Sequence, residues 1–123
     1  MGQSARCQKL LAEGEALLER FGVVLPDPNS HCLAANRVLE RLSGERGAYL
    51  AAACQCLCIA RLLHSGAISS PQSVLLGDFF QSRFTDYLLR LDAPWLQAAF
   101  ARFLADDAAR ALSLIHISPV AWT

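Results

Sequence analysis

The sequence has 123 residues, enough for one domain with a single hydrophobic core and too few for two independent cores. Hydrophobic residues make up 54% of the chain and charged residues only 18%, so we expect part of the apolar surface to be covered by a partner. The 11 basic residues balance 11 acidic ones. This balance excludes the basic surface that nucleic-acid-binding proteins present.

The cellular compartment is predicted from the N-terminal sequence and the cysteines. The first 20 residues mix charged and apolar side chains and lack the apolar core of a signal peptide. The most apolar stretch, 48–63, contains Gln55 and Arg61 and is shorter than the roughly 18 residues that a membrane span needs. An odd number of cysteines, 5, fits a reducing compartment. We expect a cytoplasmic chain without a membrane span.

The first half of the chain is predicted to form two helices, because apolar residues recur at spacings of three and four. The first helix is expected from Ser4, a suitable N-cap, to Phe21, with Gly22 directly after its end. Prolines at 26 and 28 then interrupt the pattern. The second helix is expected over about 30–42 and ends at Ser43-Gly44. Its predicted inner side consists of Leu33, Val38, Leu39 and Leu42.

The next two helices are predicted to form the centre of the fold. The stretch 45–64 is small and apolar on almost every face, which is typical of a buried central helix. A fourth helix is expected to begin with Ser70 as N-cap and Pro71 at its first position, and to run to about Leu91. Four apolar residues of this helix are spaced by four: Leu76, Phe80, Phe84 and Leu88.

A fifth helix is expected to begin with Asp92 as its cap and Pro94 in its first turn. Its apolar face would consist of Trp95, Leu96, Phe100, Phe103 and Leu104. The chain is thus predicted to be all-α, a bundle of about five helices forming one domain over 1–112. Residues 113–123 differ in character from what precedes them, and we interpret them as an atypical tail, either a frayed extension of the natural protein or a non-native segment.

The cysteines at 54, 56 and 58 suggest a metal site, since thiolates bind zinc and copper(I). On a helix, however, Cys54 and Cys58 share a face and Cys56 points to nearly the opposite side, so three sulfurs cannot converge on one ion. Cys7 and Cys32 could complete a site only if the fold brought them close. We interpret the three helical cysteines as core residues.

Other candidate groups also have a structural interpretation. His64 ends the third helix, where a cation interacts favourably with the helix dipole, and a Cys–His nucleophilic pair would need Cys54 or Cys58 to reach it. An apolar setting raises the pKa of a thiol, which argues against that pair. Asp106-Asp107 is the one adjacent acidic pair and is interpreted as a solvated helix face rather than a magnesium site.

The pair Gly77-Asp78 is unusual inside an apolar helix. Glycine destabilises a helix interior by about 0.5–1 kcal/mol relative to alanine, and a carboxylate there needs a partner or water. We interpret Gly77 as permitting close approach of the helix that ends at His64. Asp78 would accept hydrogen bonds or pair with an arginine such as Arg61.

The segment in which this pair lies resembles a known family. The sequence ARLLH at 60–64, followed by SVLLGDFF at 73–80, is similar to the all-trans polyprenyl diphosphate synthases. These all-α enzymes have a helix ending in His before an aspartate-rich motif, and a later helix with the pattern Val-Leu-x-Gly-Asp-aromatic. The likeness covers about 49–106 and implies an isoprenoid-synthase-like partial fold. His64, Gly77, Asp78, Phe79 and Phe80 would be its signature residues, with a structural role.

The same segment departs from the family where catalysis would occur. In an active synthase the aspartate-rich motif binds the magnesium ions that hold and ionise an allylic diphosphate. Here the residues after His64 are Ser65, Gly66, Ala67, Ile68 and Ser69, and none is a carboxylate. The loop is also much shorter than that of an active enzyme. We therefore assign this chain no catalytic, cofactor-binding or metal-binding residue.

This combination resembles the small non-catalytic subunit, component I, of the two-component heptaprenyl or hexaprenyl diphosphate synthases. The resemblance implies a catalytic polyprenyl diphosphate synthase subunit as partner in a hetero-oligomer, with magnesium bound by that partner. It also implies a role in making the long isoprenoid side chain of menaquinone. The alternatives are a fragment of a single-chain trans-polyprenyl diphosphate synthase and an unrelated helical interaction module.

Overall fold

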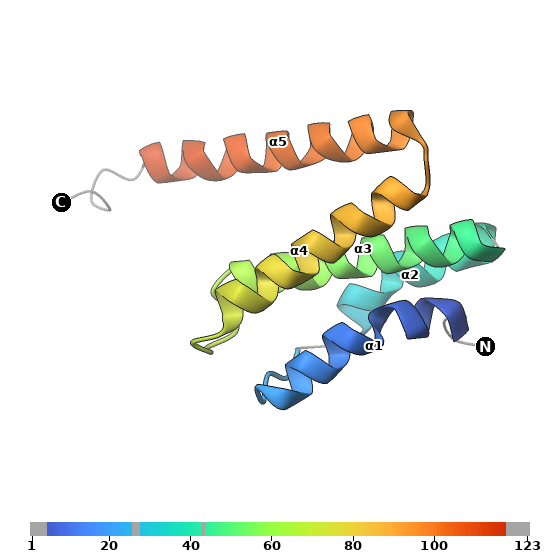
Figure 1. The fold of residues 1–123 in the computed structure, drawn as a ribbon. Coiled ribbons are helices and arrows are strands. Elements are labelled where there is room, and N and C mark those ends of the chain that lie inside the picture. Colours follow the sequence, from blue (N-terminus) through green and yellow to red (C-terminus); the bar gives the residue numbers. More distant parts are fainter. Residues whose placement is uncertain (1–4, 26–27, 43, 118–123) are drawn as a thin grey trace. The chain divides into compact units, whose positions relative to one another are not determined.

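The computed structural model describes residues 5–25, 28–42 and 44–117, and within this part it is all-α, as predicted (Figure 1). Five helices follow one another in the chain: α1 (Ala5–Arg20), α2 (Pro28–Arg41), α3 (Gly44–His64), α4 (Ser73–Arg90) and α5 (Pro94–Ile117). They belong to two compact units, Met1–Leu91 and Asp92–Thr123. Side chains are described for 5–25, 35–42, 44–106 and 109.

Helix α3 is the centre of the first unit, as its all-round apolar sequence predicted. It packs against α1, α2 and α4, and its most extensive interface is with α4 (Figure 1). Many of its buried positions hold small side chains: Ala48, Ala51, Ala52, Ala53, Cys56 and Ala60. Small side chains allow the neighbouring helices to approach closely, so that larger residues from those helices fill the core.

Helix α1 buries one narrow stripe and ends as predicted. The stripe consists of Cys7, Leu11, Gly14 and Leu18, at spacings of four, three and four. Gly22 has a φ of 66°, and its N–H donates to the carbonyl of Glu19 while the N–H of Val23 donates to that of Leu18. These two bonds form a Schellman motif, in which glycine takes the left-handed conformation without steric cost.

Helix α4 presents a row of large side chains to α1 and α3. Leu76, Phe80, Phe84 and Leu88 are all buried, which confirms the predicted row. The Phe80 ring lies against the backbone of Gly14, where a Cβ would be only 2.6 Å from Phe80 Cε1. The Tyr87 hydroxyl donates to the carbonyl of Leu10 over 2.6 Å. Glycine in α1 thus makes room for the largest fully buried ring of the core.

The start of α4 differs from the prediction. Ser70 is not the N-cap: the helix begins at Ser73, and Gln72 precedes it without a side-chain capping bond. The Ser70 carbonyl accepts a bond from the Ser73 N–H, and the Ser70 hydroxyl bonds to Gln72. Ser70 is therefore used in a turn before the helix. The hydroxyl of Ser73 donates to the carbonyl of Ile68, which fixes the turn to the preceding loop.

Helix α2 also differs in detail. It begins at Pro28, two residues earlier than expected, because proline is tolerated in the first turn of a helix. Leu42, predicted to face inward, lies after the last helical residue and is 39% exposed. Val38 and Leu39 are half-buried, whereas Ala35 is fully buried. The side chain of Leu33 lies outside the described ones. Among the described side chains of α2, the small Ala35 is thus the one that is fully buried in the core.

The second unit is described as the single helix α5. Ala93, not Asp92, takes the capping position, because its carbonyl accepts bonds from the N–H groups of Leu96 and Gln97. Asp92 has a φ of 50° and forms the turn before the helix. The side chain of Trp95 is 73% exposed and that of Phe103 is 47% exposed. The helix continues without interruption into the predicted tail, as far as Ile117.

Among the described helices, α3 alone is long and apolar enough to cross a membrane by length and composition. Most of this segment is buried inside the fold, as is usual for the core helix of a globular unit. A buried core helix passes the same test as a membrane span, so this finding is weak evidence for a span.

Replacing Gly14 with alanine tests the contact between α1 and α4. Helix propensity alone would stabilise α1 by about 0.5–1 kcal/mol. We expect the opposite, a loss of about 1–3 kcal/mol, because the new methyl group would overlap the buried Phe80 ring. Urea denaturation of both proteins measures the difference. A more stable Gly14→Ala variant would show that the ring can move without cost.

Candidate functional site

The family-like segment forms a contact between the end of α3 and the first turns of α4. Gly77 is buried, and the His64 ring packs on its backbone. A Cβ at position 77 would lie 2.5 Å from both Cδ2 and Nε2 of His64. No side chain larger than hydrogen fits there without displacing the imidazole. The close approach expected at Gly77 is thus present, and the group that makes it is His64 itself.

Asp78 forms a hydrogen bond across the same contact. Nε2 of His64 lies 3.0 Å from Oδ1 of Asp78, and because a carboxylate can only accept, the hydrogen is on Nε2. The side chain of His64 is 36% exposed and that of Asp78 is 64% exposed. Solvent therefore screens this pair, and it contributes little to stability. The suggested pairing of Asp78 with an arginine such as Arg61 stays a prediction.

The two aromatic residues that follow extend this contact to α1. The rings of Phe79 and Phe80 meet edge to face with centroids 5.4 Å apart. Phe80 is buried against Gly14, whereas Phe79 is half-buried beneath the guanidinium of Arg83, which lies 5.2 Å from the ring centroid. Arg83 in turn binds Glu13 of α1 over 2.7 Å. The signature residues therefore contact both α1 and α3.

The loop that joins α3 to α4 uses its polar groups locally. The Ser65 hydroxyl donates to the carbonyl of Leu62 and accepts from the N–H of Ala67. Gly66 has a φ of 83°, a left-handed conformation that suits glycine at the end of α3. Residues 65–72 contain no carboxylate. Among the described residues no three His, Cys, Asp or Glu side chains are grouped so that they could hold a metal ion.

The helical cysteines lie in an environment that keeps them as thiols. Burial raises the pKa of Cys56 to about 12 and that of Cys54 to about 11. Burial also raises the pKa of Cys58. Cys56 is buried, whereas Cys54 and Cys58 are half-buried on the other side of α3. The prediction that an apolar setting raises their pKa values is confirmed, and low thiolate content argues against a Cys–His nucleophile.

The remaining candidates are partly outside the described side chains. Asp106 is exposed on α5, as expected for a solvated face. The side chains of Cys32 and Asp107 are not among the described ones.

Sequence reasoning missed the part of this contact that α1 supplies. Gly14 and Glu13 receive Phe80 and Arg83, and neither was predicted to matter. A signal for Gly14 was present, since it lies at an inward position of the apolar stripe of α1. The same argument that identified Gly77, a glycine in place of a better helix former on a buried face, applies to it.

A double-mutant cycle tests the contact between Gly77 and His64. In the wild-type background we expect Gly77→Ala to destabilise by about 1 kcal/mol, because the imidazole must leave its place. In the His64→Ala background the same change should stabilise by about 0.5 kcal/mol through helix propensity. Urea denaturation of the four proteins gives the coupling. Equal effects in both backgrounds would contradict the contact.

Asp78→Asn should change stability by less than about 0.5 kcal/mol.

The raised pKa of Cys54 predicts slow alkylation. A thiol with a pKa of about 11 has little thiolate at pH 8. We expect iodoacetamide to react with Cys54 at least about tenfold more slowly than with the urea-unfolded chain, after allowing for the stronger nucleophilicity of a basic thiolate. The rate should rise about tenfold per pH unit up to about pH 10. Peptide mass spectrometry measures it, and equal rates in folded and unfolded chains would refute the prediction.

Comparison with known proteins adds no assignment to this geometry: no family model, curated protein or solved structure matches the chain.

Proposed function

We propose that this chain is a non-catalytic, regulatory subunit of a heteromeric polyprenyl diphosphate synthase of the heptaprenyl type. It supports the formation of a long isoprenoid chain, such as the side chain of menaquinone, by binding to a catalytic subunit. The magnesium ions and the prenyl diphosphate are bound by that partner.

The observation that carries this proposal is the contact between His64 and Gly77. In the resembled family the His ends the helix that precedes the aspartate-rich motif, and the Gly-Asp pair lies on a later helix. Here the two residues lie in van der Waals contact, with Asp78 bonded to His64 over 3.0 Å. The residues that resemble the family signature thus pack α3 on α4, which supports a structural role for them.

The chemistry of the loop supports a non-catalytic role. Ionisation of an allylic diphosphate needs magnesium, and magnesium needs hard oxygen ligands such as carboxylates. Residues 65–72 offer serine hydroxyls, and that of Ser65 is already bonded to its own turn. Asp78, although exposed, has one oxygen bonded to His64. These residues are poorly suited to hold a magnesium–diphosphate complex.

The exposed apolar residues support a role that depends on a partner. On α4 alone, Val74, Leu75 and Leu89 are 63%, 72% and 59% exposed. Val74 and Leu75 lie three and two residues before Gly77 in the chain. Apolar surface of this kind is characteristic of protein interfaces. A subunit that acts through contact would present such surface next to its signature residues.

Co-expression with a catalytic subunit that contains both aspartate-rich motifs tests the proposal. The measurement is magnesium-dependent elongation of farnesyl diphosphate with isopentenyl diphosphate, with product length determined by chromatography. We expect no product from this chain alone. We expect at least tenfold faster formation of a long-chain product from the two subunits together than from the catalytic subunit by itself. An unrelated helical protein of similar size, co-expressed in its place, is the control.

Two results would contradict the proposal in different ways. If the catalytic subunit makes the same product at the same rate alone, the chain is a helical interaction module of another kind. If the isolated chain turns over both substrates with magnesium, it is a piece of a single-chain synthase.

A further inference from the structure

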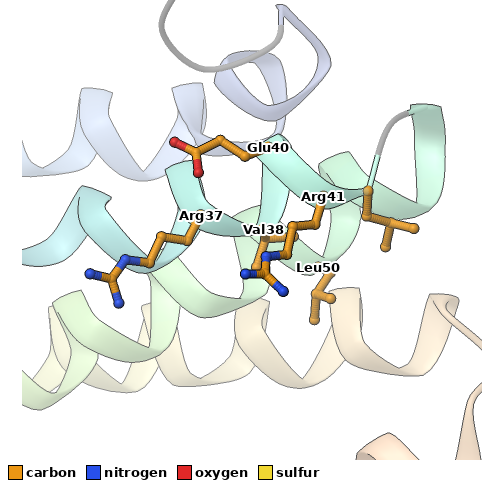
Figure 2. A pocket seen from close by; sticks show the side chains of 6 residues that line it. Arg37, Val38, Glu40, Arg41 and Leu50 are labelled. Atoms are coloured by element: carbon orange, nitrogen blue, oxygen red, sulfur yellow. The ribbon is translucent and has the colours of Figure 1, made fainter.

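Helices α2 and α3 form an open, largely apolar groove, which we call the arginine groove (Figure 2). Its volume is about 560 Å³. The lining residues are Arg37, Val38, Glu40, Arg41, Leu42 and Leu50. Val38 and Leu50 are half-buried at its base, and Leu42 is 39% exposed. The groove therefore exposes apolar side chains of the first unit to solvent.

Two arginines give this groove a definite chemistry. Arg37 and Arg41 are exposed, lie one helical turn apart, and extend on the same side of α2, whereas the carboxylate of Glu40, which also lines the groove, is drawn apart from both guanidinium groups (Figure 2). Neither guanidinium has an ion-pair partner among the described residues. Guanidinium groups spaced in this way complement carboxylates spaced by one turn on another helix. The groove thus favours an acidic helix over a basic one.

The apolar surface continues from the groove along α3. Leu50, Cys54 and Cys58 are spaced by four and are all half-buried, whereas the residues 51–53 and 55–57 between them are buried. This row is one face of α3 that α1, α2 and α4 leave partly uncovered. Leu50 belongs both to this row and to the lining of the groove, where it lies with Val38 and the two arginines. The apolar row and the charged groove therefore meet at Leu50.

We propose that the arginine groove and this row bind an amphipathic helix of the catalytic subunit, one with carboxylates a turn apart for Arg37 and Arg41 and apolar residues against Leu50 and Cys54. The inference rests on the proposed function, since it specifies the surface through which that partner is bound. The arginines supply orientation and association rate, and the apolar row supplies the buried area.

Charge reversal at the groove tests this surface. Arg37→Glu/Arg41→Glu should raise the Kd for the purified catalytic subunit at least tenfold and reduce the activation in parallel. Arg37→Lys/Arg41→Lys, which keeps the charge, should stay within about threefold of wild type. The matched control is Arg20→Glu/Arg102→Glu, with two exposed arginines outside the groove. Binding of the wild type should weaken with added salt, and binding of the reversed variant should respond less.

The outcomes separate this inference from the function on which it rests. If the wild type binds and activates the catalytic subunit and the reversed variant does so equally well, the groove is not the interface although the proposed function holds. If the wild type does not bind at all, the proposed function fails and the inference fails with it. Circular dichroism melts confirm that the exposed substitutions leave the fold intact.

Other occupants of the groove are distinguished by two further measurements. If sedimentation shows a dimer of this chain that Arg37→Glu/Arg41→Glu dissociates, a second copy occupies the groove and the proposal is wrong. A Leu42→Cys variant, followed by maleimide labelling and mass spectrometry, should be reactive alone and protected by the catalytic subunit. If the Leu42→Cys variant is unreactive in the monomeric chain, another part of the same chain covers the groove and the proposal is wrong.

Discussion

The packing of the described helices depends on one constraint, that α3 is apolar on nearly every face and must be covered on every side. Its small residues, such as Ala51 and Ala60, are fully buried, so α1, α2 and α4 come close to its backbone. Much of the core volume then comes from those helices, with Phe80 and Leu11 as the largest of their fully buried side chains. Where these three helices leave a face of α3 incompletely covered, a partner gains the most by binding.

Two glycines show how this constraint overrides helix propensity. Alanine at Gly14 or Gly77 would favour the helix locally, but a Cβ at either position would overlap an aromatic or imidazole ring. The Phe80 ring at Gly14 is fully buried and has no free space into which it could move. The His64 ring at Gly77 is part-exposed and can turn toward solvent. The same substitution therefore has different consequences at the two sites. Packing, more than the exposed His64–Asp78 bond, holds α3 and α4 together at this end.

The features that follow from sequence periodicity were predicted correctly. The predictions were wrong or incomplete where a single hydrogen bond, or the residue on the facing helix, determines the structure. The row from Leu76 to Leu88 and the Schellman glycine Gly22 follow from spacing and from backbone conformation, both of which are local. The start of α4 depends on whether the Ser70 hydroxyl bonds within a turn or caps a helix, and both use the same residue type. Gly14 was missed because the sequence shows that a residue is small but not which ring lies opposite.

The packing contacts of the candidate site were predictable from the sequence, whereas its hydrogen bond was not. His64 and Gly77 were both identified from the sequence, and their contact follows once α3 and α4 lie side by side. The use of His64 as a partner for Asp78 was not foreseen, because the distance between residues on two helices depends on their crossing. In such a motif packing residues and metal ligands are separable: the first set positions helices, and the second performs the reaction. A subunit of the kind proposed, with the first set and without the second, would act on a reaction through the shape it imposes on a neighbour, and the partly uncovered face of α3 is where we propose that this neighbour binds.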